Sequence, residues 1–130
     1  QTYGSEDYQI TPGRAYVLRS DVGMSMEWRG KEISSPVPVS FIEGWNLVAI
    51  HGTDEEYTAS SLIDSIDEVV ELDADNVTEW DPERARYEGL QKEEDDDGVM
   101  QLYGFDFPLD SKLGYFVRIA GGKGEWTPSD

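Results

Sequence analysis

Residues 111–126 read SKLGYFVRIAGGKGEW, and residues 114–120 within them form a short apolar run of aromatic and β-branched side chains. Such a run, bounded by glycine-rich turns, favours a buried β-strand. A similar phrase stands near the start of the chain, where residues 12–28 read PGRAYVLRSDVGMSMEW. The sequence therefore predicts two related strand segments, and their relation decides how the fold is organised.

The two copies of this phrase correspond residue by residue. Tyr16 corresponds to Tyr115 and Arg19 to Arg118, and a Glu-Trp pair follows each arginine. The correspondence extends upstream to Tyr3-Gly4 with Tyr103-Gly104, Asp7-Tyr8 with Asp106-Phe107, and Ile10 with Leu109. A fixed spacing of this kind is typical of a tandem array or a pseudo-symmetric fold. Either the copies are equivalent strands of one closed fold, which we favour, or one end strand pairs with a neighbouring molecule.

Further strand patterns and one helix complete the expected fold. Alternating or apolar runs predict strands over residues 15–19, 25–29, 37–42, 44–50, 77–81 and 84–88. Pro38 indicates an edge strand, and Pro82 indicates the turn of a hairpin. Thr58 is a candidate helix cap, and Leu62 and Ile66 follow at helical spacing.

The expected fold class is mainly β, a pseudo-symmetric β-barrel or β-sandwich-like domain with one short α-helix. With 38% hydrophobic residues, the chain can bury a core of one domain. We expect a single β-rich domain over residues 1–130, in which 1–33 are the tail of one repeat unit and 34–130 form the following unit.

The charge of the chain restricts its partners. With 28 acidic against 10 basic residues, the formal net charge is −18. Such a chain repels phosphate backbones and anionic membrane surfaces, so nucleic acid is not an expected partner. No apolar run reaches the roughly 20 residues that span a bilayer. Acid-rich surfaces suit high salt or divalent cations.

Catalytic patterns are weak. The chain has one histidine, His51, and no cysteine, so a zinc site or a cysteine nucleophile is not expected. No Gly-x-Ser-x-Gly stretch occurs. His51 follows an apolar run and precedes Gly52, so it is expected at the end of a strand. Paired carboxylates arise by chance among so many acids and carry little weight. We therefore expect a protein that is not an enzyme and has no firm cofactor.

Two acidic stretches are candidates for metal binding. Hard oxygen ligands suit Ca²⁺, and they are clustered at Glu93, Glu94, Asp95, Asp96 and Asp97. Residues 73–76 are a weaker candidate. Neither stretch has the spacing of an EF-hand, and the alternative interpretation of residues 92–98 is a solvated acidic loop.

Aromatic side chains are candidates for carbohydrate binding. Trp28, Trp80 and Trp126 each follow a glutamate in a short alternating segment, and flat rings can stack on the apolar faces of sugars. The alternative is that all three belong to the core. Trp45 lies in an apolar run and is expected in the core, and Asn46 is expected to hold a neighbouring turn.

The order of these motifs resembles an extracellular repeat of bacterial and archaeal surface proteins. The repeat has a "GWNLI" strand, a short helix, a "W…Y" hairpin and a "L.PGKGYWV" strand, and its anchors here are residues 44–47 and 114–117. The chain departs from it at Ala15, where glycine is expected, and at residues 111–113, where Pro-Gly-Lys is expected. The resemblance implies an exported, β-rich module strung in arrays, and it implies no catalytic activity.

Two functions from different classes follow as expectations. The first is a non-catalytic structural or adhesive module of a cell-surface or secreted protein, located outside the cell. It would assemble through edge strands with other repeats or with itself, stabilised by salt or by Ca²⁺. The alternative is a carbohydrate-binding module of a secreted enzyme, with glycans as partners.

Overall fold

The structure, a computed structural model, describes residues 7–129. Within this range the chain forms seven strands and one helix, as the sequence predicts for a mainly β protein. The elements are β1 (Val39–Phe41), β2 (Gly44–Val48), α1 (Ala59–Asp67), β3 (Asp73–Asp81), β4 (Arg86–Glu94), β5 (Met100–Gly104), β6 (Tyr115–Gly121) and β7 (Gly124–Trp126).

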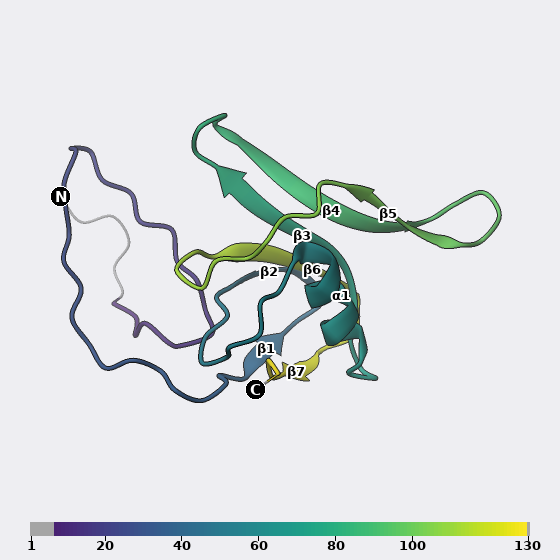
Figure 1. The fold of residues 1–130 in the computed structure, drawn as a ribbon, viewed down its shortest axis with the longest axis horizontal. Helices are drawn as coiled ribbons and strands as arrows, with labels where there is room; N and C mark the ends of the chain where they lie inside the picture. Colours follow the sequence, from purple (N-terminus) through teal and green to yellow (C-terminus); the bar gives the residue numbers. More distant parts are fainter. Residues whose placement is uncertain (1–6, 130) are drawn as a thin grey trace.

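The strands form two antiparallel sheets (Figure 1). Five strands pair in the order β2-β6-β3-β4-β5, and β1 pairs with β7 in a separate two-stranded ribbon. The C-terminal copy of the repeated phrase therefore provides a central strand, because β6 lies between β2 and β3. Strands β2 and β5 are the two edges of the larger sheet. Among the described residues, strand β1 has a single neighbour, as Pro38 in the preceding residues predicts.

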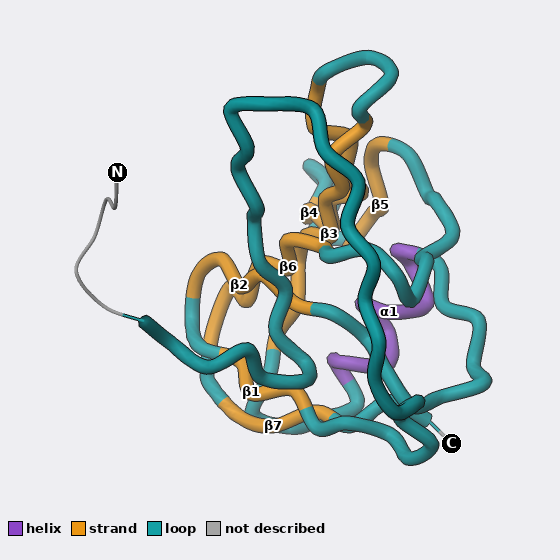
Figure 2. Tube along the Cα trace, turned by 90° about the vertical axis from the view of Figure 1, so that its left-hand side faces the viewer, coloured by secondary structure: helices purple, strands orange, loops and turns teal. Residues whose placement is uncertain are grey.

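The hydrophobic core lies between one face of the five-stranded sheet, helix α1 and the β1–β7 ribbon. On β6 the side chains of Tyr115, Val117 and Ile119 alternate inward and are buried. Opposite them α1 buries Leu62 and Ile66, at the predicted helical spacing. Figure 2 shows the helix to one side of the strands, and on the other face of the sheet the side chains of Trp45, Trp80 and Tyr87 are exposed.

Helix α1 begins where the sequence predicts. The Thr58 hydroxyl accepts a hydrogen bond from the Ser61 amide (3.2 Å), and the Ser61 hydroxyl accepts one from the Thr58 amide (2.9 Å). This reciprocal pair satisfies two amides that lack partners within the helix. Asp106, from the loop before β6, adds a third acceptor, to the Ser60 amide (2.9 Å) and the Ser60 hydroxyl (2.6 Å).

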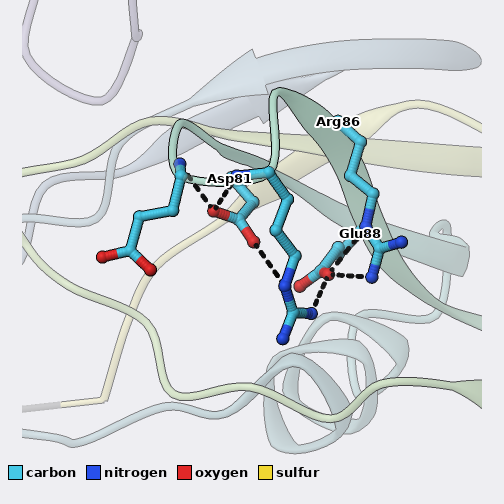
Figure 3. Close-up of polar contacts among 5 residues, drawn as sticks. Asp81, Arg86 and Glu88 are labelled. Carbon is cyan, nitrogen blue, oxygen red and sulfur yellow. Dashed lines mark hydrogen bonds and ion pairs between the residues drawn. The ribbon is translucent and has the colours of Figure 1, made fainter.

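The β3–β4 hairpin is also found as predicted, with longer strands. Asp81 closes its turn by accepting from the backbone amides of Glu83 (3.0 Å) and Arg84 (3.3 Å). Beyond the turn, Glu88 accepts hydrogen bonds from both Arg84 and Arg86, each at 2.9 Å from the guanidinium (Figure 3). Hydrogen bonds from Arg86 and then Arg84 lower the pKa of Glu88. The ion pairs therefore join the turn to the start of β4 at the exposed end of the hairpin.

The N-terminal copy of the phrase is not a strand, which corrects the prediction for residues 15–19 and 25–29. Arg14 forms a single antiparallel bridge with Val48 on β2. Two backbone hydrogen bonds flank this bridge, from Ala15 to Leu47 and from Ala49 to Gly13, each at 3.2 Å. The chain then leaves the sheet and runs as an irregular loop to β1 (Figure 1, purple to blue).

The N-terminal copy has the residue pattern of a strand, but its apolar side chains are left uncovered, which explains why it differs from the prediction. In the N-terminal copy Val17, Leu18 and Trp28 are 78%, 71% and 74% exposed, so nothing within residues 7–129 covers the apolar positions that the pattern supplies. The first matched pair of the phrase, Tyr3-Gly4, lies outside the described residues. The two copies are thus not equivalent strands of one closed fold.

The loops that precede the two copies nevertheless have the same contacts. The Tyr16 hydroxyl accepts from the Thr11 amide (2.8 Å), and the Tyr115 hydroxyl accepts from the Asp110 amide (2.6 Å). Tyr16 stacks on Tyr8 with ring centroids 5.6 Å apart. In the same way, Tyr115 stacks on the corresponding phenylalanine at 5.9 Å. The local sequence therefore sets the loop conformation in both places.

The two copies also touch each other across the edge of the sheet. Ala15 and Gly114 occupy corresponding positions in the two phrases. A Cβ atom added to Gly114 would lie 2.4 Å from the Cβ of Ala15. Next to this contact, Val48 on β2 pairs with Tyr115 on one side and bridges to Arg14 on the other.

Candidate binding face

The open face of the five-stranded sheet carries a band of aromatic side chains. Residues directly opposite in an antiparallel pair point to the same face. Leu47 pairs with Phe116, and Phe116 also pairs with Thr78. Trp45 lies two residues from Leu47 on β2 and therefore shares this face. One strand further, Trp80 pairs with Tyr87. The band therefore crosses four neighbouring strands, opposite to the face that α1 covers.

Contacts between the rings hold the band in place. Trp80 and Tyr87 meet edge to face with centroids 4.9 Å apart, and Tyr87 and Phe116 do so at 5.7 Å. Such pairs stabilise their arrangement by about 0.5–1.5 kcal/mol beyond their buried area. Trp45, Trp80 and Tyr87 remain 53%, 49% and 60% exposed. Trp80 and Tyr87 are thus ordered by ring contacts and still open to solvent, and Trp45 is exposed on the neighbouring edge strand β2.

A shallow hollow of about 470 Å³ lies within this band. Trp45, Thr78, Tyr87 and Phe116 line it. Its walls are mostly carbon, and Thr78 adds a hydroxyl that donates to the side-chain oxygen of Asn76 (2.6 Å). Polar groups also border the hollow, because Arg118 is directly opposite Trp45 on β6 and forms an ion pair with Asp75 (2.7 Å).

The three tryptophans predicted to bind sugar do not come together. Trp80 lies in the aromatic band, whereas Trp28 lies on the irregular N-terminal segment. Trp126 is buried on β7, 3% exposed, and its indole nitrogen donates to the Ser65 hydroxyl (3.0 Å). Its ring packs at the edge of Tyr57 (5.7 Å). Trp126 is therefore a core residue and not part of an exposed platform.

The prediction that Trp45 belongs to the core is wrong. On β2 the buried side chain is Val48, and the side-chain period of two places Trp45 on the opposite face. An apolar run does not show which of its faces is buried. The register of β2 against β6 decides this.

Asn46 holds the turn between β1 and β2, as predicted. Its side-chain oxygen accepts from the Ile42 amide (3.0 Å). Its side-chain nitrogen donates to the carbonyl oxygens of Ile42 (3.0 Å), Gly44 (3.1 Å) and Val117 (3.3 Å). One side chain thus joins the turn to the central strand β6, and this fixes the start of the strand that carries Trp45.

The acidic stretch from Glu93 to Asp97 is divided between a strand and a turn. Glu93 and Glu94 belong to β4, and Asp95, Asp96 and Asp97 follow in the turn to β5. Asp95 accepts from the backbone amides of Val99 and Asp97, each at 2.9 Å. The Val99 hydrogen bond is the main cause that lowers the pKa of Asp95. This carboxylate thus organises the turn.

Neither acidic stretch gathers a ligand set for a metal ion. Across residues 7–129, no three histidine or acidic side chains come together in a way that could hold one. In the stretch 73–76, Asp73 lies 3.7 Å from the Lys92 ammonium. Asp75 forms its ion pair with Arg118. The carboxylates of this second candidate thus face basic side chains of the protein itself.

Asp75 has the least solvated carboxylate of this group. Burial raises its pKa, and the nearby Arg118 charge lowers the pKa only in part. One of its side-chain oxygens is buried without a hydrogen-bond partner among the described residues.

His51 lies three residues after β2, where the sequence predicts a strand-end residue. Its carbonyl accepts from the Val37 amide (3.2 Å). His51 borders an open hollow of about 560 Å³, which Glu32, Asp54 and Ser111 also line. This hollow is built from loops.

Comparisons with protein families, with curated proteins and with solved structures gave no match. Among the residues that the structure describes, no helix is both long enough and apolar enough to cross a membrane. The aromatic band and the outer edge of β2 are therefore the features from which a function has to be inferred.

Proposed function

We propose that the chain is a non-catalytic structural or adhesive module of a cell-surface or secreted protein, which assembles with other copies of its own repeat through the outer edge of β2. One observation carries this proposal. The edge already accepts residues 13–15 in antiparallel pairing, and the apolar residues that follow them are exposed. An edge strand with free backbone groups is a template for a further strand.

The register of a longer pairing follows from the bridge. Because Arg14 is opposite Val48, a continued antiparallel strand places Tyr16 opposite Asn46 and Val17 opposite Trp45. Tyr16 then points to the buried side of the sheet, as its counterpart Tyr115 does. Val17 joins Trp45 on the open face. The N-terminal phrase thus has the correct alternation for a sixth strand on this edge.

A second copy is a suitable donor of this strand. Within one chain the pairing ends at Ala15 and residues 16–38 leave the sheet, so most of the outer edge of β2 lacks a partner among the described residues. Residues 13–18 of a second molecule can occupy the whole edge in this register when they displace residues 13–15 of the first, and the reciprocal exchange gives a closed two-fold dimer. A one-way exchange gives a chain of molecules.

The net charge predicts how assembly depends on salt. Two copies, each of formal charge −18, repel each other, and added salt screens this repulsion over a Debye length of about 8 Å at physiological ionic strength. We therefore expect association to strengthen with salt. Calcium is expected to act in the same direction by neutralising carboxylates.

Light scattering after size-exclusion chromatography tests the proposal, at low and high salt, in EDTA and in calcium. We expect a molar mass above the 14.6 kDa of one chain that rises with concentration and salt. Val17→Pro removes the amide that would donate to Trp45 in the extended pairing, and should return the protein to a monomer. Val22→Pro, a control at another exposed position of the same segment, should not. A monomer in every buffer overturns the proposal.

A further inference from the structure

We propose that the aromatic hollow on the open face of the five-stranded sheet binds a neutral carbohydrate chain, with Trp45 and Tyr87 as its two walls. This site goes beyond assembly, since it uses the face of the sheet whereas assembly uses the edge of β2. Phe116 and Thr78 form the floor between the two walls. No described element covers this side.

The rings are arranged for binding before a ligand arrives. Each stands on a paired strand, and edge-to-face contacts join Trp80 to Tyr87 and Tyr87 to Phe116. Aromatic side chains have only two side-chain torsions, so they lose little conformational entropy when a ligand contacts them. An exposed aromatic surface built on paired strands therefore binds with a lower ordering cost than a loop would carry.

The composition of the hollow matches a sugar. A pyranose ring has an apolar face of C–H groups and a rim of hydroxyls, so it needs ring faces to stack on and polar groups at the border. The hollow offers the rings of Trp45 and Tyr87 together with the Thr78 hydroxyl. Arg118, held in place by Asp75 at 2.7 Å, lies beside Trp45 and can donate to sugar hydroxyls. Thr78 and Arg118 already have partners in Asn76 and Asp75, so both polar groups are held in fixed positions beside the stacking surface.

The charge of the protein selects a neutral sugar. At a formal net charge of −18, the molecule repels polyanions such as uronate-containing or sulfated glycans. Arg118, which lies next to the hollow, is already paired with Asp75. A neutral hexose, pentose or N-acetylhexosamine chain has no such penalty.

Titration with four neutral oligosaccharides tests the proposal: cellohexaose, xylohexaose, mannohexaose and chitohexaose, followed by tryptophan fluorescence and calorimetry. We expect saturable binding of at least one of them. Trp45→Ala and Tyr87→Ala should each weaken it roughly tenfold or more. Trp45→Phe should restore part of the affinity. Trp28→Ala, which removes a more exposed ring outside the hollow, should leave it unchanged.

Three results overturn the proposal: no binding of any of the four at about 10 mM, tighter binding of polygalacturonate than of the neutral chains, or equal losses in the Trp28 and Trp45 variants. Thermal unfolding of each variant shows whether it is folded. Val17→Pro separates the two proposals, because it should abolish assembly and retain sugar binding. The assembly proposal and the sugar-binding proposal can therefore be refuted independently of each other.

Discussion

The two copies of the repeated phrase have the same local structure and different surroundings. In both, a tyrosine hydroxyl accepts from the amide five residues earlier, at 2.8 Å for Tyr16 and 2.6 Å for Tyr115, and each ring stacks on an aromatic neighbour. Yet Tyr115 begins a central strand and is 1% exposed, whereas the residues after Tyr16 form no strand. Local sequence thus sets the loop, and pairing with β2 and β3 makes the strand.

The largest difference in unfolding free energy is expected between variants of the corresponding tryptophans, Trp28 and Trp126. Trp126→Ala empties a core position where the ring packs on Tyr57 and Phe41, and should lower the free energy of unfolding by about 3–5 kcal/mol. Trp28→Ala should change it by less than about 0.5 kcal/mol. Urea unfolding followed by circular dichroism measures both. Equal losses would show that the N-terminal copy is packed in solution as well.

A pair of corresponding glycines gives the next largest effect. Gly122 has a φ of +89°, and a Cβ there would lie 1.8 Å from the Glu71 carbonyl oxygen. Gly122→Ala should therefore cost roughly 2–4 kcal/mol through backbone strain and displacement. Gly23, its counterpart, has open space around it, and Gly23→Ala should be near neutral in the same assay. A stable Gly122→Ala variant would contradict the tight turn between β6 and β7.

The next prediction concerns Asn46 on β2, the strand that contacts both copies. Asn46→Ala removes the hydrogen bonds to the β1–β2 turn and to Val117 on β6, and should cost roughly 1–3 kcal/mol because the backbone groups of the turn lose their partners. Thermal melting measures this loss. Glu43→Ala, an exposed neighbour in the same turn, is the control, and an unchanged melting curve for Asn46→Ala would remove this role.

The smallest effect concerns a pair of aspartates. Partial burial raises the pKa of Asp106, but hydrogen bonds from Ser60 outweigh this and hold the pKa below its usual value. Asp106 therefore stabilises the fold above the carboxyl's unfolded pKa of about 3.9, and this contribution is lost as pH falls through the lowered folded value. Because the group is exposed, we expect Asp106→Ala to cost about 1 kcal/mol at pH 7.

Unfolding free energies measured between pH 7 and pH 2 check this prediction. The cost of Asp106→Ala should shrink to near zero at the acid end, where the wild-type carboxyl is protonated as well. Asp7→Ala alters the corresponding residue of the N-terminal copy, which is exposed, and should leave the pH profile unchanged. A cost that is constant with pH would mean that the charge of Asp106 does not matter.

The features predicted from sequence are those that neighbours along the chain determine. Thr58 caps α1 through Ser61, three residues away, and Asp81 closes a turn with Glu83 and Arg84. Asn46 likewise holds a turn within its own segment. Contacts of this range depend on residue type and spacing, which the sequence shows directly.

The features that were missed depend on pairing between distant segments. Residues 15–19 have a pattern typical of a strand, but their pairing with β2 ends at Ala15, so the rest of the segment forms no strand. Trp45 is exposed and Trp126 is buried because the register of each strand, not its composition, decides which side chains point inward. The aromatic hollow combines residues from β2, β3, β4 and β6, and no short motif in the sequence shows that combination.

The contact between Ala15 and Gly114 limits how alike the two copies can become. Where corresponding positions of a duplicated sequence meet in space, the same side chain cannot occupy both unless there is room for two. Here the space holds one methyl group, on Ala15, and the 2.4 Å approach excludes a second on Gly114. The difference between alanine and glycine at these positions is therefore a steric requirement of the fold. An Ala15→Gly, Gly114→Ala exchange should be tolerated better than Gly114→Ala alone.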